Sequence, residues 1–344
     1  MRIFNTNMAN KDLAVVHAIK NITILWIIFV HTVVTVGYIS GNSTEISELN
    51  ATYYILVTGT LAFDTMFFVS GVFSAHHFFY LKGRYTVEEL VSCGGPCGQA
   101  LQVICFITNR AIRLLPPYIY TIFLAAVLAR VSNDTATLTL PERDYENCES
   151  YWWRNVLYIN NYYSNDKQCM QVSWYLATET QMHMIGAFLC LMLTTKRKRF
   201  LATITVFCLL ATTIVDIIGT YTKNGYSITD SFAAYTSIII RPWSRVAPYF
   251  LGLLTGWLVH RIDGYLAISK TSSVGLWISS ASILVVSSVV PWLDAGWMAA
   301  WLHLSWPMAL IWPVVVCATK YTYSSRRIVD SKLSAGFSRL CYCA

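Results

Sequence analysis

Lys20-Asn-Ile-Thr-Ile-Leu-Trp-Ile-Ile-Phe-Val-His31 places a basic residue at the foot of an apolar run and a histidine inside it. An α-helix rises about 1.5 Å per residue, so His31 should lie roughly 16 Å above Lys20, near the middle of a hydrocarbon layer about 30 Å thick. An ionisable imidazole at that depth is costly unless it faces a polar interior. Two interpretations follow: a histidine hydrogen-bonded to a neighbouring helix, or a catalytic base that substrates reach from both membrane faces.

The composition favours a membrane protein, since 55% of the 344 residues are hydrophobic and only 12% are charged. Apolar stretches of about 20 residues can each cross a bilayer as a helix, so we predict an all-α, polytopic transmembrane helix bundle. The net charge is +7, and the basic residues fall between these stretches. This distribution indicates membrane topology rather than nucleic-acid binding. The predicted spans, about eight in number, are 21–40, 54–80, 114–131, 173–194, 200–221, 246–260, 273–293 and 298–318.

Basic residues decide the predicted orientation. A cytosolic N-terminus places most lysines and arginines inside, among them the Lys196-Arg-Lys-Arg199 run, in agreement with the positive-inside rule. We therefore expect one multi-pass membrane domain over 1–344, with a cytosolic segment 1–20, an outer loop at about 132–172 and a cytosolic tail 319–344. The plasma membrane and an internal membrane both fit this arrangement.

The outer side carries glycosylation sequons and a pair of cysteines. The sequons begin at Asn42, Asn50 and Asn133, in loops placed outside, and predict a glycoprotein. Cys148 and Cys169 share the large outer loop, where an oxidising compartment favours a disulfide between them. Two free thiols are the alternative.

Two arginines precede the third predicted span in Arg110-Ala-Ile-Arg113. Residues three apart share a helix face, so both guanidinium groups can point the same way and hold phosphate groups. Ordinary cytosolic anchoring of the span is the alternative.

A carboxyl group interrupts the second predicted span in Phe63-Asp-Thr-Met-Phe-Phe-Val-Ser-Gly71. An ionisable residue inside a span is a functional candidate by default, and Asp64 can pair with His31 or with a cation. Ser70, with Gly71 beside it, can either supply a hydroxyl or allow another helix to approach closely.

Glu179 and His183 lie four positions apart and hence on one face of the fourth predicted span. They can form a proton relay or an acceptor-binding pair, or simply satisfy each other. No third ligand accompanies them, so we expect no metal site. At the outer mouth of the sixth predicted span, Arg241 and Arg245 can receive an acceptor or lipid headgroup, or pair with acidic residues of the outer loop.

Together these residues resemble the membrane acyltransferase-3 superfamily and, within it, the invertebrate group called nose resistant to fluoxetine. The matching stretches follow the family order along almost the whole chain. They are Lys20 with His31, Phe63 to Gly71, Arg110-Ala-Ile-Arg113-Leu-Leu-Pro-Pro117, Trp152 to Asn161 between Cys148 and Cys169, Ser173-Trp-Tyr-Leu-Ala177, and Arg241-Pro-Trp-Ser-Arg-Val-Ala-Pro-Tyr249.

The resemblance implies an O-acyltransferase that moves an acyl group from cytosolic acyl-CoA to the hydroxyl of a small-molecule, lipid or glycan acceptor. It gives His31 the catalytic role with Lys20 as its basic partner, and it assigns Arg110 and Arg113 to the acyl donor. No bound cofactor is expected, since acyl-CoA is a substrate. The remaining predicted site residues are Asp64 and Glu179 in the catalytic group, and Arg241, Arg245, Ser70 and His183 as substrate-binding residues.

Three departures qualify the resemblance. Lys20 stands where the family usually has arginine, which keeps the charge but loses the bidentate fork. Glu179 replaces an aspartate, and the chain ends at Ala344 where family members continue with further helices, so we expect a C-terminally truncated sequence. A non-enzymatic lipid or xenobiotic transport protein on the same scaffold is the alternative function.

Overall fold

A computed structural model describes nine stretches of the chain and scattered positions between 200 and 218. The stretches are 13–39, 50–85, 94–135, 144–164, 167–194, 240–262, 266, 268–289 and 296–318. The chain divides into two compact units. The first comprises Met1–Leu81, Val206–Thr229 and Arg245–Ala344, and the second comprises Lys82–Thr205 and Asp230–Ser244. One continuous membrane domain over 1–344 stays a prediction.

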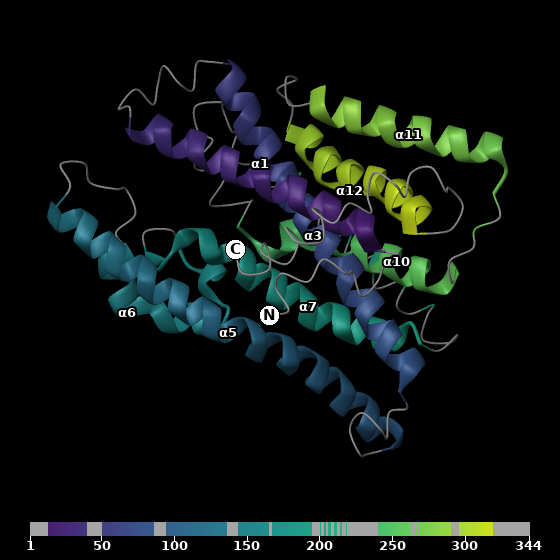
Figure 1. Cartoon of the computed structure of the whole chain (residues 1–344), viewed down its shortest axis with the longest axis horizontal. Helices are drawn as coiled ribbons and strands as arrows, with labels where there is room; N and C mark the ends of the chain where they lie inside the picture. The colour runs from purple at the N-terminus through teal and green to yellow at the C-terminus, as the bar shows by residue number, and fades with distance from the viewer. Residues whose placement is uncertain are drawn as a thin grey trace. The chain divides into compact units, whose positions relative to one another are not determined.

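Long apolar helices build the first unit: α1 (Ala14–Ile39), α3 (Asn50–Arg84), α10 (Val246–Ile262), α11 (Lys270–Val289) and α12 (Gly296–Ala318). Helix α12 contacts α1, α10 and α11, and Figure 1 shows α11 running alongside it. Their shared core includes Val16 of α1, Phe68 and Val72 of α3, Leu251 of α10 and Val314 of α12. The short 3-10 turn η7 (Pro242–Arg245) leads into α10.

Glycines let α3 and α10 come into backbone contact. A Cβ added at Gly71 would meet the Tyr249 carbonyl oxygen, and one added at Gly252 would meet the Phe68 carbonyl oxygen. Gly256 lies against Val72 in the same way. Because only glycine permits such an approach, this crossing fixes the position of α3 within the unit.

The second unit consists of α5 (Gly95–Thr135), α6 (Asp144–Val156) and α7 (Trp174–Met192), with the short 3-10 turns η2 (Asn160–Tyr162) and η4 (Gln171–Ser173). Helix α5 packs against both α6 and α7. It is 41 residues long and passes through Pro116 and Pro117, whereas the sequence predicted only 114–131. Arg110 and Arg113 therefore lie inside the helix and not before it.

Helix α6 falls in the predicted outer loop and was not expected. Its first turn carries Asp144 and Glu146 and its last turn carries Arg154, so the charges complement the helix dipole at both ends. With 13 residues it is too short to cross a bilayer.

The all-α class is confirmed for the described residues. Each predicted span coincides with a helix except 200–221, most of which lies outside the described residues, as do Asn42, the Lys196–Arg199 run and the tail 319–344. In the described part, three helical segments are long and apolar enough to cross a membrane: Val15–Val33, Cys97–Thr135 and Thr271–Ser288. On α1, Ile22, Leu25, Ile28 and Phe29 are exposed, as expected for side chains that face lipid.

Candidate functional site

His31 and Lys20 lie on one continuous helix, α1, and the His31 ring is half-buried. The Nδ1 atom of His31 lies 2.8 Å from the backbone carbonyl oxygen of Ile27, one turn earlier. Because a carbonyl only accepts, Nδ1 must carry the hydrogen in this bond, and Nε2 of the neutral ring then holds a lone pair. This is the tautomer that a general base requires.

Helix α3 passes close to α1 beside this histidine. Gly59 packs against Val30, and a Cβ at Gly59 would lie 2.8 Å from a methyl group of Val30. One turn further along α3, the Phe63 ring meets the His31 ring edge-on, with centroids 6.1 Å apart. His31 therefore sits against the turn of α3 that carries Phe63 and Asp64.

Asp64 is fully buried and pairs with two basic side chains of the first unit. Its Oδ1 atom accepts a hydrogen bond of 2.5 Å from Nη1 of Arg245, and its Oδ2 atom lies 2.5 Å from Nδ1 of His303 on α12. Asp64 and Arg245 are both 0% exposed, and His303 is 5% exposed. Of the two partners predicted for Asp64, the structure shows the cation, while His31 bonds to its own helix.

The Asp64 carboxylate and the Arg245 guanidinium already neutralise each other, so charge balance in this cluster does not need a doubly protonated, positively charged His303 ring. A carboxylate and a guanidinium cancel, so a neutral imidazole that donates from Nδ1 to Asp64 leaves the buried group uncharged as a whole. The 3.2 Å approach of Arg245 Nη1 to the same nitrogen is then a contact between two donors and not a hydrogen bond. One position further on α3, Thr65 accepts a bond of 2.8 Å from the Trp306 indole.

Sequence reasoning missed His303. It interrupts the apolar run Trp301-Leu-His-Leu-Ser-Trp306 in the same way that Asp64 interrupts α3. The rule that an ionisable residue inside a span is a functional candidate would have found it.

In the second unit, Arg110 of α5 forms a salt bridge with Glu179 of α7. Glu179 is 2% exposed, whereas the Arg110 side chain is 30% exposed and Arg113 is exposed. Glu179 thus has Arg110 as its ionic partner, and His183 stacks on Phe106 of α5 with ring centroids 5.0 Å apart. The sequence analysis paired Arg110 with Arg113 and Glu179 with His183. In the structure, the salt bridge between Arg110 of α5 and Glu179 of α7 connects these two pairs.

Arg241 binds the turn η2 within the second unit. Its Nη1 atom donates to the carbonyl oxygens of Asn161, at 3.2 Å, and Tyr162, at 3.0 Å. The guanidinium also lies over the Trp243 ring, 5.8 Å from its centroid. Arg241 therefore contacts the predicted outer loop through backbone carbonyls rather than acidic side chains, and Arg245 contacts Asp64.

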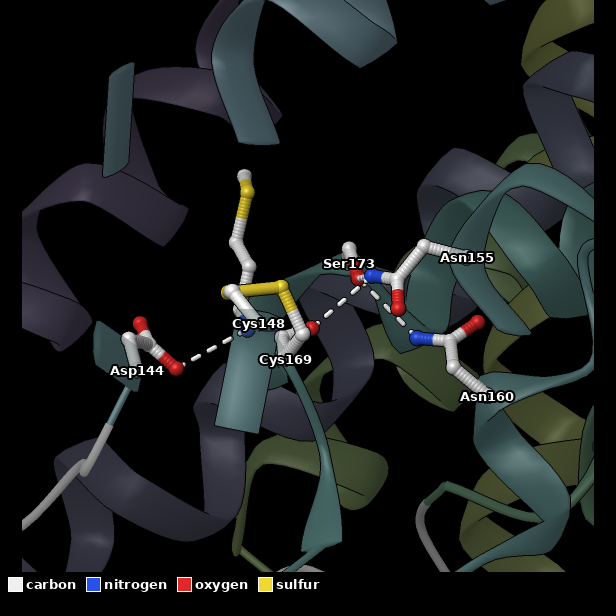
Figure 2. Close-up of a disulfide and its surroundings, with 7 residues drawn as sticks. Asp144, Cys148, Asn155, Asn160, Cys169 and Ser173 are labelled. Atoms are coloured by element: carbon white, nitrogen blue, oxygen red, sulfur yellow. Dashed lines mark hydrogen bonds between the residues drawn. A yellow bond between two sulfur atoms is a disulfide. The ribbon is translucent and has the colours of Figure 1, made fainter. Parts of the chain in front are cut away.

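The predicted disulfide between Cys148 and Cys169 is confirmed, with the two Cα atoms 4.4 Å apart. Figure 2 shows its surroundings: Asn155 and Asn160 both reach the Ser173 hydroxyl next to the disulfide. Asp144 accepts a hydrogen bond of 2.9 Å from the backbone N–H of Met170. Burial raises the pKa of Asp144, and this hydrogen bond opposes the shift only in part.

The chain matches the acyltransferase domain of the acyltransferase-3 family over residues 14–344. It belongs to this family of membrane acyltransferases. It is also similar to Nose resistant to fluoxetine protein 6 of Caenorhabditis elegans, with 22% identity over 384 aligned positions. That alignment covers 99% of this chain and 45% of the relative, so the chain spans less than half of the relative's length. No solved structure matches the chain.

The region that matches the acyltransferase-3 family contains all the predicted site residues and extends over both units. Within the described residues, no three histidine, cysteine, aspartate or glutamate side chains come together to hold a metal ion.

Proposed function

We propose that this chain is an integral-membrane O-acyltransferase that transfers an acyl group from cytosolic acyl-CoA to a hydroxyl group of an acceptor. The observation that carries the proposal is the His31 ring, which is held in an apolar helix with Nδ1 bonded to Ile27. Family membership supports acyl transfer as the reaction class. We also propose that the chain crosses the membrane several times, with its N-terminus in the cytosol.

In this mechanism the acceptor hydroxyl gives its proton to His31 Nε2 as its oxygen attacks the thioester carbonyl carbon. The new C–O bond forms, the C–S bond breaks, and the coenzyme A thiolate leaves with the proton that the imidazole has held. His31 returns to its neutral form, so no further proton donor is needed. Lys20, on the same helix, supplies positive charge toward the donor.

Arg110 and Arg113 are proposed to hold phosphate groups of the donor. Arg113 is exposed, and Arg110 is partly exposed while its salt bridge to the buried Glu179 fixes its direction. Glu179 is therefore proposed as a positioning residue for Arg110. An oriented guanidinium loses less side-chain entropy when it binds a phosphate.

The proposal is tested in membranes that contain the full chain, supplied with radiolabelled acyl-CoA and a lipid extract. His31→Asn keeps a donor near the Nδ1 position but removes the base, so acyl incorporation should fall about 100- to 10,000-fold. His77→Ala, an exposed histidine of α3, is the matched control and should keep full activity. Undiminished incorporation in His31→Asn would rule out the proposed role.

The same membranes distinguish the transport alternative. A transporter on this scaffold would show substrate flux that His31→Asn leaves unchanged, with no acyl incorporation in the wild type. Incorporation that His31→Asn abolishes supports the acyltransferase.

A further inference from the structure

Four buried polar atoms of the second unit have no hydrogen-bond partner among the described residues. They are the hydroxyl oxygens of Tyr118 and Tyr158 and the side-chain carbonyl oxygens of Asn155 and Asn160. The four residues are 5%, 6%, 0% and 1% exposed in that order. Buried polar groups in native proteins are nearly always paired, so four unpaired groups in one place require an explanation.

Three of these residues, Tyr118, Asn155 and Asn160, lie around the Ser173 hydroxyl. Asn155 and Asn160 each donate a hydrogen bond of 2.9 Å from Nδ2 to Ser173 Oγ (Figure 2). The Tyr118 hydroxyl lies beside the side chains of Ser173 and Asn155. The rings of Tyr118 and Tyr158 stack with centroids 5.8 Å apart, so the four groups form one cluster.

The direction of the Asn155 side chain is fixed by chemistry. Its Nδ2 atom also donates a hydrogen bond of 2.8 Å to the Cys169 carbonyl oxygen, which can only accept. The oxygen end of the amide is therefore the end without a partner. The disulfide at Cys169 holds this arrangement in place.

Two polar side chains close to the cluster, those of Gln181 and Asn161, are by contrast fully paired. Gln181 donates from Nε2 to the Tyr158 carbonyl oxygen at 2.7 Å and accepts from Asn161 at 3.1 Å. Asn161 also donates to Thr178 at 3.0 Å. Gln181 and Asn161 thus have their hydrogen bonds, whereas each of the four residues of the cluster has one polar atom without a partner among the described residues. Each unpaired buried group costs about 1–3 kcal/mol of stability.

The backbone of Tyr158 adds a second unfavourable feature. Helix α6 ends in a Schellman motif, in which Ile159 N–H donates to the Arg154 carbonyl and Tyr158 N–H donates to the Asn155 carbonyl, both at 2.9 Å. Tyr158 occupies the left-handed position of this motif with a φ of 56°, where glycine is usual. A bulky residue at this position indicates that its side chain has a use that offsets the strain.

We infer that Tyr118, Tyr158, Asn155 and Asn160 form a binding site for an uncharged, polyhydroxylated part of the acceptor. None of the four side chains carries a charge, and together they offer two acceptor oxygens and two phenol groups that donate or accept. A ligand hydroxyl matches both kinds of group, because it donates to an amide oxygen and accepts from a phenol. Several neighbouring hydroxyls, as in a sugar or a glycerol headgroup, satisfy all four.

The location agrees with the proposed function, on which the assignment to the acceptor rests. Burial raises the pKa of Tyr158, the Glu179 carboxylate raises it further, and Arg110 opposes both, so the phenol stays protonated and lies within reach of both charges. Arg110 is the proposed donor-binding residue. The proposed acceptor site and the donor arginine therefore belong to the same compact unit.

The test uses the full chain in lipid nanodiscs, with Tyr118→Phe, Tyr158→Phe and the double variant. Tyr120→Phe, on α5 and 66% exposed, is the matched control. Removing an unpaired buried hydroxyl should leave the unfolding temperature unchanged or raise it. Saturable binding of tritiated methyl β-D-glucoside or glycerol should weaken roughly fivefold for each hydroxyl removed, with no change in Tyr120→Phe.

Three results would overturn the inference: no saturable binding of either probe to the wild type, equal binding by the double variant, or a lower unfolding temperature in both single variants. The last result would mean that the hydroxyls have structural partners. Binding that behaves as expected, in membranes that show no acyl transfer, would instead contradict only the proposed function. Where transfer does occur, the double variant should raise KM for octyl β-D-glucoside and leave transfer to 1-octanol unchanged.

Discussion

Asp64 and His303, which are 239 positions apart in the sequence, are joined by a hydrogen bond of 2.5 Å between Oδ2 and Nδ1. The other oxygen of the same carboxylate accepts from Arg245, so three segments of the first unit meet at one buried charge. Phe63, the neighbour of Asp64, touches His31. The cluster therefore fixes the rotation of α3 at the level of the proposed catalytic base.

Replacing Asp64 should destabilise the first unit strongly, because Arg245 would remain as a buried charge without its counter-ion. Asp64→Ala is expected to cost about 3–5 kcal/mol of unfolding free energy. The measurement is thermal unfolding in detergent, followed by size-exclusion chromatography. In a double-mutant cycle, Asp64→Ala with Arg245→Ala should cost less than the sum of the single changes. Strict additivity would show that the two groups do not interact.

His303 should be replaceable by a residue that keeps its donor. Asparagine places an amide N–H near the position of Nδ1, so His303→Asn should retain most of the stability that His303→Leu loses. The expected loss in His303→Leu is about 1.5–3 kcal/mol, the range for a hydrogen bond to a charged group. Unfolding temperatures of both variants, measured side by side, check this order. Equal temperatures for the two would contradict the hydrogen bond.

The sequence was sufficient to place ionisable side chains at special positions but not to pair them. A carboxyl or imidazole in an apolar run must find a polar partner, which is why His31 and Asp64 stood out. Which partner Asp64 takes depends on how tertiary packing brings Arg245 and α12 to α3, and no local pattern encodes it. The same holds for Glu179, whose partner Arg110 lies 69 positions away on another helix.

Helices and the disulfide were predictable for a different reason. Apolar runs of sufficient length specify spans locally, and two cysteines in one loop that is predicted to lie outside have few alternatives to pairing. Helix α6 was not predicted because its sequence is too polar to stand out as an apolar span. Charged residues in its first and last turns stabilise it instead. The unpaired hydroxyls of Tyr118 and Tyr158 cannot be read from sequence at all, since being unpaired is a property of three-dimensional packing.

The glycine crossing of α3 and α10 gives a prediction with an internal control. Gly252→Ala would place a methyl group against the Phe68 carbonyl, which cannot move without separating the helices. We expect a loss of about 1–3 kcal/mol or more. Gly275→Ala on α11, where an added Cβ meets nothing within 4 Å, should instead gain up to about 1 kcal/mol from helix propensity. Unfolding temperatures that shift in the same direction for both variants would contradict the crossing.

Asp144, the first residue of α6, gives a pH-dependent prediction. Burial raises its pKa above the ordinary value of 3.8, so the folded state holds the proton more tightly than the unfolded chain does. The stability that this group contributes is therefore complete below its unfolded pKa and is lost as the pH rises through the folded pKa. Asp144→Asn cannot ionise but keeps an oxygen that accepts from the Met170 N–H.

We therefore expect Asp144→Asn to match the wild type in stability at about pH 3 and to exceed it at about pH 7. Unfolding temperatures of both proteins across this range provide the measurement. Asp144→Ala is the control, because it removes the acceptor oxygen as well and should lose the Met170 hydrogen bond at every pH. A wild type that is more stable than Asp144→Asn at neutral pH would mean that the ionised carboxylate is the favoured form at this position, because the hydrogen bond from Met170 and the dipole of α6 would then outweigh burial.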